Sequence, residues 1–101
     1  MPEEWIAIIA GLLSALKIDL GITTNAYDER MTQYLKSSYE AIKEEGINLD
    51  VSSMKDQQLV ILYSAWMWRR RDSGEGMPRM IRYALNNRLF SEKMKGASDN
   101  G

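Results

Sequence analysis

The feature that most constrains this chain is a run of ten residues, Leu59 to Trp68, in which Ser64 is the only residue that is not hydrophobic. A helix that is apolar on every side has to be covered on every side, whereas an ordinary surface helix carries a single apolar stripe. A chain of 101 residues buries a smaller share of its surface than a large domain does. Covering this helix therefore requires most of the other elements, or neighbouring subunits. We expect Leu62 and Trp66 to be among its most buried residues.

Three consecutive arginines, Arg69 to Arg71, end this run. The carboxyl end of a helix favours cations, because the aligned peptide dipoles leave partial negative charge there. The triplet therefore forms a dense positive patch at the end of a hydrophobic helix. This arrangement is more typical of an assembly component than of a catalyst.

The overall composition indicates one folded domain. Hydrophobic residues make up 45% of the chain and charged residues 27%, which excludes the disordered class. Thirteen basic residues against fourteen acidic ones give a net charge of −1, unlike the strongly basic proteins that grip nucleic acid over a broad face. The chain has neither cysteine nor histidine, so it lacks disulfides, thiolates and the commonest general base. We expect a protein of a reducing cytoplasm that is not an enzyme.

Apolar residues recur at helical spacing in four segments, which glycine and small polar residues separate. The predicted helices run from Pro2 to about Leu16, from about 26 to 45, from Ser52 or Ser53 to about Arg71, and from Pro78 to about Lys95. The fold is predicted to be all-α, a small bundle of about four helices in a single domain over residues 1–95, with a flexible tail at 96–101. Phe90 is placed on the apolar side of the last helix. The predicted core residues are Leu35, Ile42, Leu59, Leu62, Trp66, Ile81 and Leu85.

The apolar run near the amino terminus, Trp5 to Leu16, is too short to span a bilayer. A secretory signal begins with basic residues, and here Glu3 and Glu4 occupy that position. We interpret the run as a core helix and expect no contact with a membrane.

Arginines in the carboxyl-terminal half are the candidates for partner contact: Arg69, Arg70, Arg71, Arg79, Arg82 and Arg88. They share one surface if the last helix folds back on the helix before it. One interpretation is a solvated collar with salt bridges to Asp72 and Glu75. The other is contact with an acidic partner or with phosphates. The sequence supports the two about equally, since the arginines are bunched more tightly than solubility requires.

No group of residues predicts a catalytic, cofactor or metal site. The carboxylates are scattered over loops and helix ends without the spacing of a calcium loop. The serines have no histidine to activate them as nucleophiles. An enzyme of the phosphoesterase or nuclease type would need a carboxylate–metal cluster that the sequence does not offer.

Four segments, taken in their order and spacing, carry a likeness to a known family: Leu16 to Asp19, Tyr27 to Ile42, Leu59 to Arg69 and Met77 to Arg88. The first segment has a leucine, a basic residue, an isoleucine and an aspartate in succession, and the second is a predicted helix that begins with acidic residues. The third is an apolar helix that ends in an aromatic residue and an arginine, and the fourth is a final segment with a proline near its start. Together they resemble the small head–tail connector proteins of tailed bacteriophages and prophages, the portal-adaptor or head-completion family. The resemblance covers residues 12–95, and the last helix looks longer and more arginine-rich than is usual in that family.

The resemblance implies an all-helical structural subunit in a ring of about a dozen copies, joined by head-to-tail contacts. The ring would sit under the portal protein, extend the DNA channel and offer a docking surface to a tail or head-completion protein. DNA would pass through it without sequence-specific binding. The expected locations are the bacterial host cytoplasm during assembly and then the virion neck, and the carboxyl-terminal part is the expected contact with the portal.

The main alternative is a small helical DNA-binding regulatory domain. In that hypothesis Arg79, Arg82, Asn86 and Arg88 lie on a recognition helix, because arginine and asparagine suit base edges. The slight acidic excess and the lack of a clear helix-turn-helix turn argue against it. Neighbouring genes for a portal, a terminase and a capsid protein would favour the connector.

Overall fold

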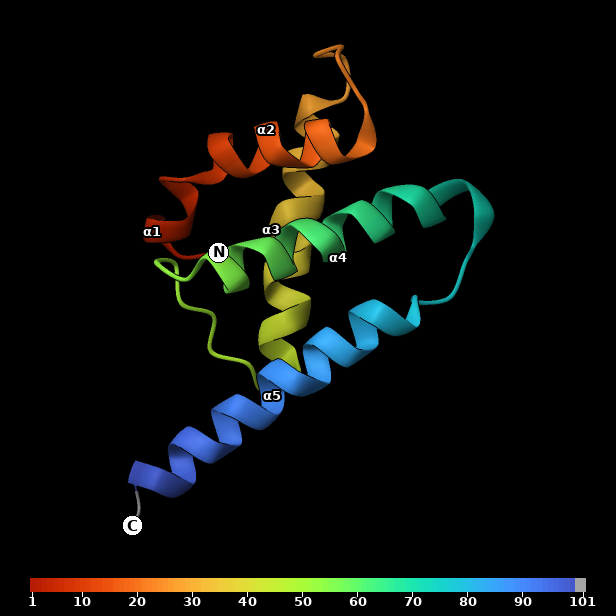
Figure 1. Cartoon of the computed structure of the whole chain (residues 1–101). Coiled ribbons are helices and arrows are strands. Elements are labelled where there is room, and N and C mark those ends of the chain that lie inside the picture. Colours follow the sequence, from red (N-terminus) through yellow and green to blue (C-terminus); the bar gives the residue numbers. More distant parts are fainter. Residues whose placement is uncertain (100–101) are drawn as a thin grey trace.

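Helices account for all the regular secondary structure in residues 1–99, which are the residues that the computed structural model describes. In chain order they are α1 (Glu3–Ile6), α2 (Ile9–Leu20), α3 (Asp28–Glu44), α4 (Met54–Ser73) and α5 (Arg79–Asp99). In Figure 1, α2 and α4 lie across α3, and α5 runs along the opposite side of α4 from α2. The predicted all-α fold is confirmed over these residues.

The amino-terminal helix, predicted as one element, consists of two. Ile8, with φ −106° and ψ 6°, separates α1 from α2. The interruption costs little, because the amide of Ile8 still donates to the carbonyl of Trp5 and the carbonyl of Ile8 accepts from Leu12. Trp5 is fully buried and its ring centroid lies 5.4 Å from that of Tyr39, so α1 closes one end of the core.

The other helix boundaries follow local signals in the sequence. Ser53 is the amino cap of α4, because its hydroxyl oxygen accepts a hydrogen bond from the amide of Asp56 at 3.2 Å. Gly21 ends α2 and Gly74 ends α4, both with left-handed φ values of 68° and 67° that favour glycine. α2 and α4 each extend a few residues beyond the predicted ends, to Leu20 and Ser73.

α4 is the central element, since it packs against α2, α3 and α5. Its enclosure is nevertheless incomplete, and the prediction that Leu62 and Trp66 are among the most buried residues is wrong. Leu62 exposes 39% of its surface, because α5 leaves open a hollow beside α4 that Leu62 lines. Trp66 is only half-buried, and its indole N–H donates to the carbonyl of Gly76 at 3.2 Å, which holds the ring along the surface loop.

The remaining predicted core residues are all buried: Leu35, Ile42, Leu59, Ile81 and Leu85. The sequence missed Ile47 and Leu49, which are also buried although they lie in the connector between α3 and α4. Two apolar residues in an irregular segment show no helical period, so only the path of the connector reveals that they enter the core.

Two small polar side chains occupy the crossing of α3 and α4. The hydroxyls of Ser38 and Ser64 are fully buried and lie 2.8 Å apart, and the Ser64 hydroxyl lies 2.8 Å from the carbonyl of Val60. Their small size lets the two helices approach closely, and their mutual hydrogen bond removes the cost of burying them.

α5 differs from its prediction at two points. Phe90 exposes 63% of its surface instead of packing inward. Phe90 lies nine positions after buried Ile81, which is about two and a half helical turns, so the two side chains point in opposite directions. The helix also continues through Gly96 to Asp99, where a tail was predicted, and residues 100–101 lie outside the described part.

A pair of leucine substitutions tests this corrected core. Leu35→Ala should lower the free energy of unfolding by about 2–5 kcal/mol, because it empties a fully buried site. Leu62→Ala should cost less than about 1.5 kcal/mol, because the removed atoms were already partly in water. Urea denaturation of the two variants checks this, and a larger loss for Leu62→Ala than for Leu35→Ala would contradict the observed packing of α4.

Candidate partner-binding surface

The structure divides the candidate arginines into two sets. Arg82 and Arg88 on α5 are held by carboxylates of this chain. Arg79 and the three arginines at the end of α4 are exposed. We call Arg69, Arg70 and Arg71 the arginine collar. Within the described residues only this second set lacks a close carboxylate partner, so the six candidate arginines differ in how much unpaired charge they offer.

Arg88 neutralises a buried carboxylate. Its Nε lies 2.8 Å from Oδ1 of Asp56 and its Nη2 lies 3.1 Å from Oδ2, while Asp56 is almost fully buried. Arg88 also donates to the carbonyl of Asn48 and forms a salt bridge with Glu92. The hydrogen bond to Asp56 is the main cause that raises the pKa of Arg88 above its ordinary value.

Arg82 forms a second two-point pair, with Glu45 at the end of α3. Both Nη atoms of Arg82 lie 2.9 Å from a carboxylate oxygen of Glu45, and this hydrogen bonding raises the pKa of Arg82. The partners are separated by 37 residues in the chain, and those of the Arg88 pair by 32. No local spacing rule connects residues so far apart, which explains why the sequence placed these arginines on the partner surface.

Two arginines of the arginine collar pack against tryptophan rings. The guanidinium of Arg71 lies 3.6 Å from the ring centroid of Trp68, and that of Arg70 lies 4.8 Å from the ring of Trp66. Arg71 also donates to the carbonyl of Trp68 at 2.6 Å. These contacts reduce the freedom of two long side chains, so less conformational entropy is lost when a partner binds them.

The aromatic layer under the collar continues to α3. Trp68 is buried, with Tyr27 and Tyr34 packed edge-on against it at centroid distances of 5.3 and 6.2 Å. This cluster holds the end of α4 to the start of α3. The position of the arginine collar is therefore set by a packed interface and not by a free helix end.

Acidic neighbours only partly neutralise the collar. Arg71 makes a long salt bridge of 3.7 Å with exposed Asp72, and no other collar arginine pairs with a carboxylate among the described residues. Glu75, the other partner expected from the sequence, makes no salt bridge within that part of the chain. The collar therefore keeps most of its positive charge.

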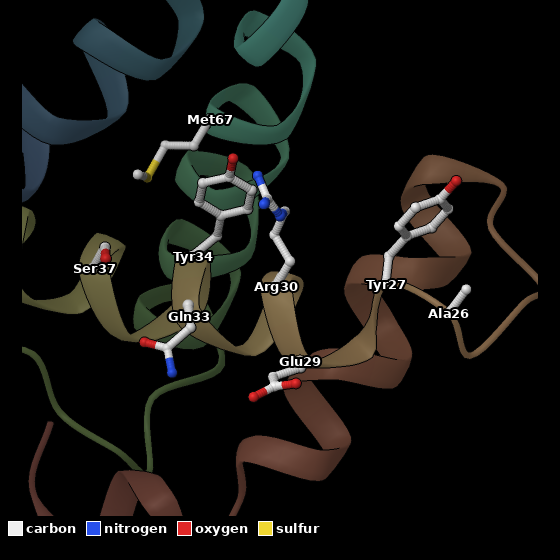
Figure 2. A pocket seen from close by; sticks show the side chains of 8 residues that line it. All are labelled: Ala26, Tyr27, Glu29, Arg30, Gln33, Tyr34, Ser37 and Met67. Atoms are coloured by element: carbon white, nitrogen blue, oxygen red, sulfur yellow. The ribbon is translucent and has the colours of Figure 1, made fainter.

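An open hollow of about 540 Å³ lies beside the collar and is formed mainly by α3. Figure 2 shows Arg30 and Tyr34 pointing the same way from α3, toward the side of the hollow that Met67 of α4 lines. A smaller hollow of about 270 Å³ shares Tyr34 and Met67 and is closed by Arg70 and Arg71. Cations and aromatic faces therefore adjoin here, and Arg30 of α3 adds a further positive charge next to Tyr34.

The described residues contain no group of three or more histidine, cysteine, aspartate or glutamate side chains placed to hold a metal ion. Burial raises the pKa of Tyr39 and of Tyr63 above the ordinary value. Among the helices of residues 1–99, none has the length and hydrophobicity needed to cross a membrane.

No family model, curated protein or solved structure matches this chain.

Removing Arg88 should destabilise the protein far more than removing Arg79. Arg88→Ala leaves Asp56 buried without its cation, and we expect a loss of about 3–5 kcal/mol. Arg79→Ala removes an exposed arginine of the same helix and should change stability by less than about 0.5 kcal/mol. Equal shifts of the two variants in chemical denaturation would show that the Arg88–Asp56 pair does not hold α5.

Proposed function

We propose that this chain is a non-enzymatic assembly subunit of the head–tail connector type. In this role several copies join head to tail in a ring that docks on the portal protein of a phage or prophage. The arginine collar contacts carboxylates of the neighbouring copy or of the portal. The ring surrounds passing DNA and presents a surface to the tail or head-completion protein.

The arginine collar is the observation that carries this proposal. Three adjacent exposed arginines have one weak carboxylate partner within the described residues, and the guanidinium groups of two of them lie over tryptophan rings. Guanidinium groups that are held in place with little carboxylate pairing are suited to two-point contacts with carboxylates of a partner. The resemblance to the connector family supplies the identity of the larger assembly.

The distribution of charge suits head-to-tail contacts. The collar lies at the end of α4, and exposed Glu3 and Glu4 lie on α1 at the opposite end of the molecule (Figure 1). Surfaces of opposite charge at opposite ends favour contact between the front of one copy and the back of the next. Such heterologous contacts close into rings when the rotation between copies permits it.

The DNA-binding alternative loses two of its four recognition residues. Arg82 and Arg88 are tied to Glu45 and Asp56, and Asn86 lies 3.4 Å from the Arg82 guanidinium. Reading base edges with these arginines would require breaking the pairs that hold α5 to the rest of the molecule. This cost supports an assembly role over a regulatory one.

Electron microscopy with the portal protein from the same genome tests the proposal directly. We expect the purified protein to form rings when the portal is present, because head-to-tail contacts of modest strength are completed on a template. The portal without this protein is the control. Absence of any ring or of added density on the portal would contradict the connector role.

A DNA titration separates the two functions. In the connector role, affinity for a short duplex is negligible at physiological salt, whereas a regulator binds tightly with a steep salt dependence. Fluorescence anisotropy at two salt concentrations measures both quantities. Sequence-specific binding with a dissociation constant tighter than about 1 µM would overturn the connector proposal.

The collar itself is tested by removing its charge. Arg70→Gln with Arg71→Gln should reduce ring formation on the portal at least about tenfold, because charge-assisted contacts are lost. Lys43→Gln with Lys55→Gln removes the same charge from exposed positions elsewhere and should leave assembly unchanged. Circular dichroism of both variants checks the fold, since Arg71 also packs on Trp68. Equal loss of assembly in both double variants would show that only total charge matters.

A further inference from the structure

α5 carries a second exposed surface, which is apolar. Met80, Tyr83, Phe90 and Met94 expose 82%, 60%, 63% and 53% of their surface, and exposed Asn87 lies in the middle of them. We call these five residues the α5 stripe. Four large hydrophobic side chains gathered on one helix face are unusual for a small monomeric protein, and such patches mark sites of contact.

The hydrophobic residues of the stripe face away from the core, while Asn87 also borders the hollow beside α4 that Leu62 lines. Ile81 and Leu85 are buried and attach α5 to the core, whereas the stripe occupies the opposite side of the same helix. Figure 1 shows α5 at the edge of the molecule, with its carboxyl-terminal half extending beyond the other helices. Arg82 and Arg88 lock the orientation of α5 by their pairs with Glu45 and Asp56.

The spacing of the stripe has a specific meaning. Its positions, 80, 83, 87, 90 and 94, alternate steps of three and four residues. A stripe confined to these positions is the narrow seam of a coiled coil, in which 80, 87 and 94 take the a positions and 83 and 90 the d positions. A helix that only packs on its own domain needs no second seam of this kind.

We propose that the α5 stripe pairs with the α5 stripe of a second copy of this chain, as a short parallel two-stranded coiled coil in register. In this arrangement each a residue meets its own equivalent, and so does each d residue. Tyr83 and Phe90 form two aromatic layers, and Asn87 lies between them. The bodies of the two copies lie on opposite outer sides, because each α5 turns its other face to its own core.

Asn87 identifies both the partner and the orientation. A side-chain amide is both donor and acceptor, so two Asn87 side chains satisfy one another, and an asparagine at an a position favours parallel dimers in register. An antiparallel pairing sets a positions against d positions, so it would place Asn87 opposite Tyr83 or Phe90 and lose this match. The flanking positions add no repulsion, since Arg79 would face Ala84 and Asn86 would face Ser91 of the other copy.

The exposed area sets the strength of the pair. With about 200 Å² for each complete side chain, the four hydrophobic residues offer roughly 500 Å² per copy, or about 1,000 Å² in the pair. This value is at the lower limit of specific interfaces, so we expect a reversible dimer with a dissociation constant in the micromolar range or weaker. The helix is already folded on its domain, so pairing does not have to nucleate it.

This pairing goes beyond the proposed function and does not depend on it. The stripe lies on α5, while the collar lies at the end of α4, so the two contacts use different surfaces. Loss of portal docking therefore leaves α5 pairing unaffected, and the two proposals fail in separate experiments.

Sedimentation of the isolated chain over a range of concentrations tests the pairing. We expect a shift from monomer toward dimer as the concentration rises, and at least a tenfold weaker association for Tyr83→Ser with Phe90→Ser. Met54→Ser is the matched control, because Met54 is 77% exposed but lies at the start of α4, and it should not alter association. A wild-type chain that stays monomeric at millimolar concentration overturns the proposal, as does an equal effect of Met54→Ser.

Single cysteines determine the register, because the chain has no cysteine of its own. Asn87→Cys and Met80→Cys should each form a disulfide between two copies under mild oxidation, since a parallel pair brings equivalent a positions together. Met54→Cys, equally accessible, should remain largely monomeric. Crosslinking of all three variants to the same extent, or of none, overturns the parallel pair, and crosslinking of Asn87→Cys without Met80→Cys overturns its orientation.

Discussion

The ion pair between Arg88 and Asp56 is the interaction on which the arrangement of the carboxyl-terminal half depends. Asp56 lies in the first turn of α4, where its carboxylate accepts hydrogen bonds from Arg88 of α5 and from the amide of Asp50 in the preceding connector. A buried carboxylate is stable only when its charge and lone pairs are satisfied. Two helices and a connector are therefore held in one geometry by a single side chain of α4.

This pair, together with the one between Arg82 and Glu45, separates arginines with structural roles from arginines with exposed charge. Arg82 and Arg88 complete the fold and keep the outward face of α5 in a defined direction. The collar at the end of α4 is fixed differently, because Arg70 and Arg71 lie over the rings of Trp66 and Trp68, and within the described residues only Arg71 of the three pairs with a carboxylate. Arginine thus has two roles here: Arg82 and Arg88 stabilise the fold, and the arginine collar presents exposed positive charge.

The two exposed surfaces follow from how α4 is covered. α4 uses its sides to pack against α2, α3 and α5, and each of these helices then turns another face to solvent. For α5 this outer face is the hydrophobic α5 stripe, and the elongated molecule, about 51 by 30 by 18 Å, places it at one margin. A small chain that must enclose one very hydrophobic helix has few residues left to cover the others. Apolar area left uncovered in this way is available to other chains.

Much of the fold is encoded in short-range signals. The all-α class, the amino cap at Ser53, the ends at Gly21 and Gly74 and five of the seven predicted core residues follow from spacing and turn chemistry that act within a few residues. The tertiary structure alone decided what depends on contacts between distant segments. It exposed Leu62 and Phe90, brought Ile47 into the core, and paired Arg82 and Arg88 with carboxylates more than thirty residues away. The spacing of residues along a helix predicts which side chains share a face. Only the packing of the helices against each other determines whether that face meets the core or the solvent.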